Sequence, residues 1–494
     1  MSIQPEIKKA ETLSGITFTA KNAVECKVSI KEEETAEEIY TSGRVSLNYI
    51  DCQKNEVRYG GKVIFNVAYG SNQLKKAEAG VEFSYKTEVE GVREGDILTY
   101  DVWLENVKLS VINGLPTITG AVVLKGYVEK QVEFEYLRQC EGVNLKKEET
   151  ENALICANET KTFTIEEEFD TSAIIGEVLC HNETVKILGV LSGIGAVAVS
   201  GEIELSMVIL PLEGAPVCHK QVIPFRLEHE IQKAMPDLIS LTNACLNDAT
   251  LKIVVDKNKE KSTVFLRAEI SLSTRLYENR NLAFNVDAYC ISKELNLEKI
   301  TKKFTKTRGQ RYLESKVSMG GISKSYENSR LIAPLFAKIE QIELKTSLCE
   351  IEIDGVVETS FLMQGENGYF IERSNIPFNI KDNTDCNKID ISTCAVTDLT
   401  ACEENGNLLI SFNLSCLVEE REENSFTMLS GVIEGEDKAV NNSAISVCIP
   451  SADDTLWELS KALGVAEEEI LKLNPELTFP LTGEERVVVY REIK

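Results

Sequence analysis

The sequence is poor in the features that mark most enzymes and membrane proteins. Its 494 residues include only 3 histidines, 11 prolines and 2 tryptophans. It contains no GxxxxGK(S/T) phosphate loop, no GxGxxG after a strand, no GxSxG nucleophile elbow and no HExxH zinc motif. No apolar run approaches the roughly 18–20 residues that a membrane-spanning helix needs. We therefore expect a protein without enzymatic activity, cofactor or membrane span.

Basic residues are also scarce relative to acidic ones. The chain has 53 Lys and Arg against 79 Asp and Glu, which gives a net charge of −26. Because nucleic acids and anionic membranes attract clustered Lys and Arg, this balance argues against both as partners. The first residues, Met1–Glu6, lack the basic and apolar stretches of a secretory signal. We expect the protein to stay in the cytoplasm.

The 14 cysteines are scattered from Cys26 to Cys448 without a CxxC pair. A disulfide framework is one interpretation, but cytoplasmic cysteines are mostly small buried hydrophobes, and we expect free thiols. Two dipeptides, Cys180-His181 and Cys218-His219, could supply four zinc ligands. Because neighbouring residues on a strand point to opposite faces, both members of such a pair seldom reach one ion, and we expect no metal site.

Apolar residues alternate with polar ones along much of the chain, which is typical of half-buried strands. The alternation is clearest in three long stretches, 118–128, 264–276 and 408–418. Amphipathic helices are hard to find before residue 450. The sequence therefore predicts a mainly β protein with antiparallel sheets, since one face of each strand can be wet.

The same layout precedes each of these three stretches. A strand leads to a glycine that opens an alternating segment, and a phenylalanine follows it by 22, 24 and 23 residues, in the pairs Gly61 and Phe83, Gly201 and Phe225, and Gly355 and Phe378. We interpret the chain as three repeated, sandwich-like β domains at 20–136, 150–281 and 312–422, after an N-terminal extension at 1–19. The glycines are expected to serve tight turns that need positive φ.

Two further stretches are predicted to be connections. Residues 282–311 are rich in lysine and arginine and are interpreted as a solvated connector, with an acid-binding patch for a partner as the alternative. Residues 423–443, which include Glu434–Asp437 and Asn441–Ser443, have turn formers and little apolar pattern. We interpret them as a linker.

The pattern changes to helical spacing in the last 51 residues, 444–494. Ala444–Ile449 is predicted to be a short strand, and Asp453–Thr455 offers an N-cap for a first helix. Glu467–Leu473 is predicted to be a second helix, and Arg486–Arg491 returns as a strand. These elements form a small βααβ module.

The motifs of this module resemble those of LysM domains. They are Asp454–Trp457, Leu463–Val465, Leu473–Pro475 and Val487–Val489. LysM domains bind N-acetylglucosamine glycans such as peptidoglycan in a groove between the loop after the first strand and the loop after the second helix. Carried over by position, the ligand-binding or partner-binding residues are Ser451, Asp453, Asp454, Thr455, Asn474, Pro475 and Leu477. The LysM core is expected to contain Leu456, Trp457, Leu463, Ile470 and Leu473.

Two of these residues allow a second interpretation. Trp457 has the helical spacing of a core residue but could also offer a flat face to a sugar. Asn474 either caps the helix end or contacts a ligand. The module also departs from the usual pattern, because Asp453 stands where glycine is common and ten acidic residues against five basic ones give it a net charge of −5.

The three repeats resemble the SPOCS domain of spore-forming Firmicutes in short fragments such as Gly201–Leu205, Ile223–Phe225 and Val286–Tyr289. Three such repeats and one LysM domain together resemble the SipL- and SpoVID-like spore coat morphogenetic proteins. The resemblance implies a non-enzymatic scaffold in the mother-cell cytoplasm at the forespore surface. Its LysM domain would dock a coat morphogenetic ATPase, and other coat proteins would be further partners. The alternative is a cell-wall protein whose LysM domain binds peptidoglycan or cortex.

Overall fold

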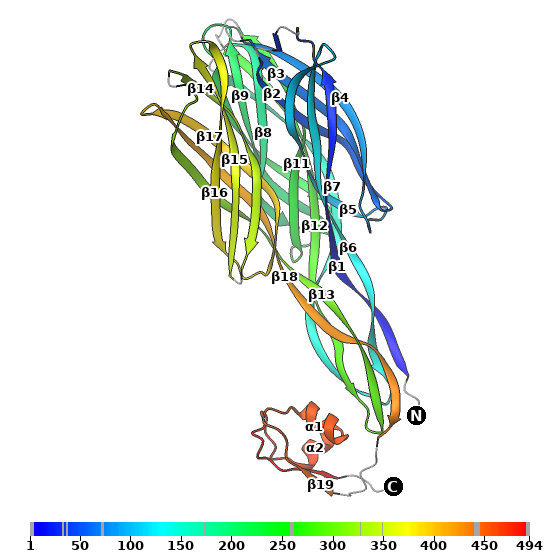
Figure 1. Cartoon of the computed structure of the whole chain (residues 1–494). Helices are drawn as coiled ribbons and strands as arrows, with labels where there is room; N and C mark the ends of the chain where they lie inside the picture. Colours follow the sequence, from blue (N-terminus) through cyan, green and yellow to red (C-terminus); the bar gives the residue numbers. More distant parts are fainter. Residues whose placement is uncertain are drawn as a thin grey trace.

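The computed structural model describes residues 4–31, 34–35, 38–70, 74–171, 174–256, 261–326, 328–347, 349–438 and 445–490. Long antiparallel strands make up most of this part of the chain, and two short helices lie near its C-terminus (Figure 1). The mainly β prediction is confirmed. The predicted linker residues Asn441–Ser443 lie outside the described residues.

Each repeat consists of six strands arranged as two three-stranded sheets. In the first repeat, the first, sixth and fifth strands form one sheet, and the second, third and fourth strands form the other. The two sheets share one apolar core of residues such as Tyr59, Phe65, Ile118 and Leu124. The strands are β1 (Pro5–Lys27), β2 (Glu38–Gln53), β3 (Glu56–Tyr69), β4 (Lys75–Glu88), β5 (Ile97–Ile112) and β6 (Leu115–Cys140).

The second and third repeats have the same strand order, β7-β12-β11 with β8-β9-β10, and β13-β18-β17 with β14-β15-β16. The second repeat contains β7 (Asn144–Thr171), β8 (Ile175–Ser192), β9 (Ala196–Pro211), β10 (Val217–Glu230), β11 (Ile239–Asp256) and β12 (Lys261–Tyr289). The third contains β13 (Lys293–Ile322), β14 (Arg330–Thr346), β15 (Glu350–Gly365), β16 (Gly368–Asn383), β17 (Lys388–Glu404) and β18 (Asn407–Asp437).

The repeated glycines do not lie in turns, and that prediction is wrong. Each lies within the central strand of the three-stranded meander, directly opposite the repeated phenylalanine: Gly61 pairs with Phe83, Gly201 with Phe225 and Gly355 with Phe378. A Cβ atom on these glycines would meet a backbone oxygen of the preceding strand at 1.9, 2.5 and 2.3 Å. The glycine is therefore needed for close approach of the two backbones at a bulge.

Positive φ is needed instead at two hairpins that join the last two strands of a repeat. Asn113-Gly114 connects β5 to β6 with φ of 51° and 76°, and Asn405-Gly406 connects β17 to β18 with φ of 51° and 82°. Both central residues of this turn type have positive φ, which suits the twist of the flanking strands.

The first and last strands of every repeat continue beyond the sandwich and form a common stem (Figure 1). β1 pairs with β6, β7 with β12 and β13 with β18 along almost their full lengths. Aromatic and apolar residues of all three ribbons pack there, with Phe134, Phe284, Phe304 and Met428 fully or almost fully buried. The stem thus gives the three repeats a shared core.

The stem changes three of the expected boundaries. The predicted N-terminal extension, residues 1–19, is mostly strand β1 from Pro5 onward. The predicted connector, residues 282–311, belongs to β12 and β13, and residues 423–437 of the predicted linker are the second half of β18. These segments look like connections in sequence because their apolar contacts are with strands of other repeats.

The C-terminal module contains β19 (Ile445–Cys448), α1 (Leu456–Leu463), α2 (Glu467–Leu473) and β20 (Val487–Tyr490). The two strands pair antiparallel, with Ile445 opposite Tyr490. Thr455 and Glu458 form a capping box at the start of α1, and Gly464 ends this helix in the left-handed conformation. The module has its own core of Leu459, Val465, Ile470, Leu481, Val487 and Val489.

Candidate functional site

The loops predicted to form the LysM groove lie next to each other. The backbone N–H of Asp453 donates to the Leu481 carbonyl at 2.9 Å, which joins the loop after β19 to the segment after α2. Asp454 accepts a 2.7 Å hydrogen bond from the Ser451 backbone N–H. Thr455 is occupied as the N-cap of α1. The polar groups of this loop therefore hold its own conformation.

Asn474 acts as a structural bridge at the end of α2. The residue is 3% exposed. Its amide nitrogen donates to the carbonyls of Ile470 and Val488, both at 2.8 Å, and its oxygen accepts from the Val488 N–H at 2.7 Å. These bonds join the end of α2 to β20. Beside it, Pro475 is exposed and Leu477 packs partly against the module core.

The residues predicted for the LysM core separate into two groups. Ile470 is buried, and Leu456 and Leu463 pack partly against the core. Leu473 is 42% exposed, so its prediction is wrong: the short helix α2 turns it away from the core. Trp457 also lies outside the module core, because α1 directs it toward the stem.

The contact of Trp457 is with the end of β12. Its ring meets that of Tyr289 edge-on, with the ring centroids 4.9 Å apart. Its indole N–H donates a hydrogen bond to the Asp287 carboxylate at 2.9 Å. Lys461 donates to both oxygens of Asp287 at 2.7 Å. Burial alone would raise the pKa of Asp287, but the hydrogen bonds from Lys461 and Trp457 outweigh it and lower the pKa. This contact fastens the first helix of the module to the stem.

Sequence reasoning missed the role of Asp287 and Tyr289. Both lie in the fragment Val286–Tyr289, which carries part of the SPOCS resemblance. An aspartate and a tyrosine at the end of a long alternating strand give no sign of their partner, since Trp457 is 170 residues away from Asp287 in the chain.

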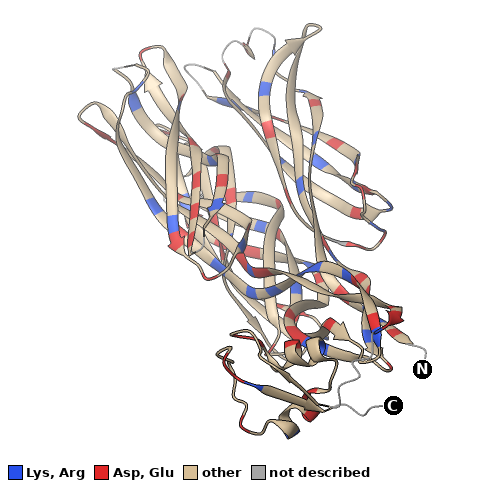
Figure 2. Cartoon of the chain, turned by 60° about the horizontal axis from the view of Figure 1, so that its bottom comes forward, with Lys and Arg blue, Asp and Glu red and all other residues tan. Residues whose placement is uncertain are grey.

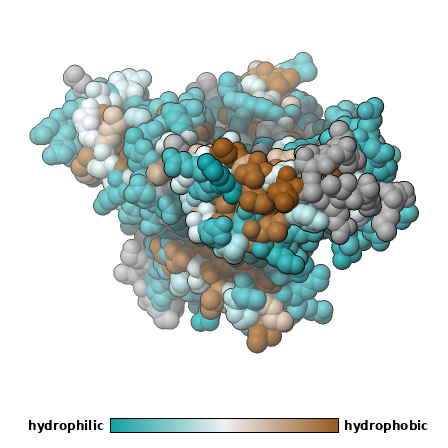
Figure 3. All heavy atoms as spheres, turned by 90° about the horizontal axis from the view of Figure 1, so that it is seen from below, coloured by the Kyte–Doolittle hydropathy of each residue, from teal (hydrophilic) through white to brown (hydrophobic). Residues whose placement is uncertain are grey.

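One face of the two-stranded sheet in the C-terminal module is apolar and exposed to solvent. Ile445, Val447 and Ile449 are 65, 58 and 69% exposed, and their neighbours Val488 and Tyr490 on β20 are 36 and 54% exposed. We call these five residues the module sheet face. Figure 3, which views the molecule from below, shows hydrophobic residues gathered at this end. Apolar patches on otherwise polar proteins commonly mark protein interfaces.

Several basic residues of 282–311 are paired with carboxylates within the protein. Lys303 contacts Glu423 at 2.7 Å, and Lys306 and Arg308 pair with Glu151 and Glu422. Figure 2 shows basic and acidic positions beside each other on the stem ribbons. These contacts disfavour an acid-binding patch for a partner.

A buried charged cluster joins the three repeats where the sandwiches meet the stem. Arg421 on β18 pairs with Glu129 on β6 and with Glu419 at 3.0 Å. Arg275 on β12 pairs with the same two carboxylates, at 3.4 Å to Glu129, and Tyr277 donates to Glu129. The charged side chains are 1–5% exposed. We call these five residues the junction cluster.

The junction cluster is electrically balanced, with two carboxylates and two guanidinium groups. Burial would raise the pKa of Glu129, but Arg421 and Arg275 outweigh it and hold the pKa below its ordinary value. Glu129 therefore stays ionised at neutral pH. The four ion pairs within the cluster support a structural role, since removing one member of a buried ion pair is strongly destabilising.

A cleft of about 650 Å³ lies between the three repeats. Tyr100, Trp103 and Lys125 of the first repeat line it, together with Asn243 of the second and Cys394 of the third. Arg275 and Glu419 of the junction cluster also border it. The exposed residue Asp101 lines this cleft, and desolvation by the surrounding protein raises the pKa of its carboxyl, although Lys125 opposes the shift. The lining of the cleft thus mixes apolar, polar and charged side chains.

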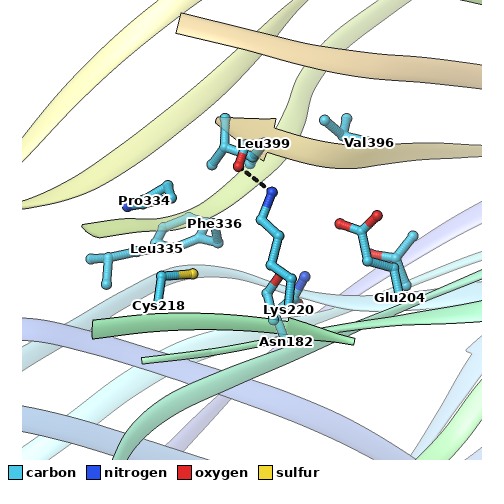
Figure 4. A pocket seen from close by; sticks show the side chains of 12 residues that line it. Asn182, Glu204, Cys218, Lys220, Pro334, Leu335, Phe336, Val396 and Leu399 are labelled. Atoms are coloured by element: carbon cyan, nitrogen blue, oxygen red, sulfur yellow. Dashed lines mark hydrogen bonds between the residues drawn. The ribbon is translucent and has the colours of Figure 1, made fainter. Parts of the chain in front are cut away.

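A much smaller pocket lies between the second and third repeats (Figure 4). Lys220 on β10 reaches across it and donates to the Leu399 carbonyl on β17, close to Phe336 and Cys218. Its volume is about 20 Å³, which leaves room for about one water molecule. This pocket is a point of contact between repeats.

The two Cys–His dipeptides are used in packing. His181 contacts Glu183 at 2.6 Å, and the ring of His219 stacks on Phe169 at 5.5 Å. Cys180 and Cys218 lie on opposite sides of Val208 in the central strand. Among the described residues, no three His, Cys, Asp or Glu side chains are arranged to hold a metal ion.

Part of the chain matches a known protein family. Residues 23–112 match the family described as SipL, SPOCS domain. The matched region runs from the last residues of β1 through β5. No curated protein and no solved structure matches the chain. In the part of the chain that the structure describes, no helix is both long and apolar enough to cross a membrane. The family match supports the resemblance of the first repeat to SipL-like sporulation proteins.

Proposed function

We propose that this protein is a non-enzymatic scaffold in spore coat assembly. The observation that carries the proposal is the SipL, SPOCS domain match at residues 23–112, on a chain whose other two repeats have the same strand order. The scaffold would work in the mother-cell cytoplasm at the forespore surface. Its LysM-like module would dock a coat morphogenetic ATPase, and the β repeats would contact other coat proteins.

The module sheet face supports a protein partner. Its five residues are apolar, they lie on two paired strands or directly after one of them, and four of them are more than half exposed. Protein interfaces concentrate apolar and aromatic residues at their centre, surrounded by polar residues. The acidic character of the module, with a net charge of −5, would favour a partner with basic residues around an apolar centre.

The predicted groove offers less support for a glycan. Sugar sites usually present polar groups beside a flat aromatic face. Here the Asn474 amide is buried and its three hydrogen bonds are within the module, while Thr455 caps α1. Trp457, the one indole in the module, faces Tyr289 of the stem. Peptidoglycan binding through the groove is thus the weaker candidate.

The full chain and a chain ending at Lys438 would be tested for binding to the purified coat ATPase and to peptidoglycan. We expect the full chain to bind the ATPase and the shortened chain to lose at least ten-fold in affinity. Neither should pellet with peptidoglycan. Equal ATPase binding by both chains, or retention of the full chain alone on peptidoglycan, would contradict the docking proposal.

A pair of substitutions locates the docking surface. Val447→Asp places a charge on the module sheet face, where Val447 is 58% exposed, and should weaken ATPase binding about ten-fold or more. Leu471→Asp is the matched control, because Leu471 is 42% exposed on α2 of the same module. If both variants bind as well as the parent, the sheet face is not the docking surface.

A further inference from the structure

Two cysteines of the third repeat face each other across neighbouring strands. Cys394 on β17 is the direct register partner of Cys416 on β18. Their Sγ atoms are 2.9 Å apart, with the Cys394 thiol donating toward Cys416. Directly opposite residues of antiparallel strands have Cα atoms about 4.5–5.5 Å apart, which lies within the range that a disulfide spans. The backbone therefore already brings the two sulfur atoms together.

The two thiols differ in their access to solvent. Cys416 is 0% exposed in the core of the third sandwich. Cys394 is half-buried and lines the cleft between the three repeats, within electrostatic reach of Lys125 and Asp101 of the first repeat. A small oxidant that enters the cleft would meet Cys394 first, and Cys416 would stand directly behind it.

Another pair of cysteines shows that this arrangement is specific. Cys180 and Cys218 in the second repeat both lie opposite Val208, one on each side of the central strand β9. Two strand spacings separate them, which is about 9.5 Å and too far for a disulfide without backbone movement. Cys349 and Cys402 are exposed and serve as a measure of general surface oxidation.

We propose that Cys394 and Cys416 are a redox site that closes reversibly into a cross-strand disulfide when a peroxide enters the cleft. The Cys394 thiolate attacks one peroxide oxygen, the O–O bond breaks, and the departing hydroxide takes a proton to become water. The sulfur of Cys416 then attacks the resulting sulfenic acid, and the displaced hydroxide takes the Cys416 proton. Two thiols and one hydrogen peroxide thus give one disulfide and two waters. A dithiol reductant reverses the change.

The environment of Cys394 sets how the reaction depends on pH. Its hydrogen bond to Cys416 and its burial raise the pKa of the Cys394 thiol. Because the thiolate is the nucleophile, disulfide formation should become faster as the pH rises. The product would cross-link β17 to β18 along one wall of the cleft.

The test uses the full, reduced chain under native conditions. It is treated with hydrogen peroxide, unfolded in an alkylating agent, digested and analysed by mass spectrometry. We expect a Cys394–Cys416 linked peptide as the main disulfide, its loss after reduction with dithiothreitol, and faster formation at pH 9 than at pH 7. Cys180 and Cys218 should remain alkylatable.

The variants Cys394→Ser and Cys416→Ser should each lack the linked peptide. Mass spectrometry of the parent chain is sufficient to test the proposal, even if a variant fails to fold. Recovery of Cys394 and Cys416 as free thiols, at a peroxide level that oxidises Cys349 and Cys402, would overturn the proposal. Oxidation of Cys394 to sulfinic acid without a link to Cys416 would overturn it as well.

Discussion

The three repeats have identical residues at the glycine–phenylalanine sites but different residues at the equivalent positions that form the junction cluster. Gly61, Gly201 and Gly355 are the same residue in the same register position of all three repeats, each opposite a phenylalanine. At the junction, the residues that follow Ile118, Val264 and Leu408 by eleven positions are Glu129, Arg275 and Glu419. The residues two positions further on are a glutamine, a tyrosine and an arginine.

The difference follows from where each site lies. A glycine–phenylalanine site lies inside one sandwich. The same close approach of two backbones therefore occurs in every repeat and requires glycine each time. At the junction, the equivalent positions of three repeats meet one another. Three identical carboxylates there would repel in a region of low dielectric constant, whereas carboxylates alternating with guanidinium groups attract. The same residue is therefore needed at positions inside each sandwich, and different residues are needed at the positions where the repeats meet.

The largest effect is expected from Gly61→Ala. The new Cβ would stand 1.9 Å from the Ser46 backbone oxygen, so the two strands would have to move apart. We expect a loss of about 4 kcal/mol in the free energy of unfolding. Gly80→Ala is the control, because its Cβ would meet the flexible end of Lys62 at 2.9 Å and the nearest backbone atom, the Val63 oxygen, at an ordinary 3.6 Å. Urea unfolding of both variants measures the difference, and similar losses would show that the close approach is unimportant.

The next largest effect is expected at the junction from Arg421→Met. The change leaves Glu129 and Glu419 with Arg275 alone in a buried site, and it should cost about 3 kcal/mol. Combining it with Glu129→Gln should recover part of that loss, since the charges balance again. Arg58→Met removes an ion pair whose arginine is 58% exposed and should cost less than about 1 kcal/mol. Equal effects of Arg421→Met and Arg58→Met in denaturant titrations would refute a structural role for the cluster.

A smaller effect concerns the pH dependence of stability. The pKa of Glu129 is lower in the folded protein than the ordinary value of about 4.3. Its contribution to stability is therefore complete above about pH 4.3 and is lost as the pH falls through the folded pKa. The parent should lose more stability than Glu129→Gln between pH 6 and pH 3. Chemical unfolding at both pH values measures the difference. An equal loss of stability in the parent and in Glu129→Gln would contradict a lowered pKa of Glu129 in the folded protein.

The smallest effect is expected from Asp287→Asn at the contact between the stem and the module. The ion pair with Lys461 is partly exposed, so its loss should cost only about 0.5–1 kcal/mol of docking free energy. We expect the fluorescence of Trp457 to shift toward that of a solvated indole, with the unfolding of the β repeats unchanged. Asp390→Asn, on an exposed position of β17, is the control. An unchanged Trp457 signal in Asp287→Asn would mean that the aromatic contact alone holds the module.

The sequence could predict features that depend on near neighbours. Period-2 alternation located the long strands, and the glycine-to-phenylalanine spacing located the repeat, because both arise within one sheet. The two helices of the module lie where capping residues and apolar spacing indicated. These signals involve residues that are close in the chain or paired through short hairpins.

Features that depend on remote strands could not be predicted. Segments such as 423–437 looked like a linker, although Met428 and Leu429 are 0% exposed in the stem. Their partners lie in other repeats, so no local pattern reveals them. The same reason explains Trp457, whose spacing indicated the module core while its contacts are with Asp287 and Tyr289.

The stem also has a mechanical consequence. β18 runs from the third sandwich to Asp437, just before the module, and it is paired with β13 over most of that length. A pulling force between the sandwiches and the module would act along the strand, whereas the hydrogen bonds between antiparallel strands lie perpendicular to it. Such a force loads many bonds together in shear and does not open them one after another. The ribbon is therefore suited to carry tension between two anchored surfaces.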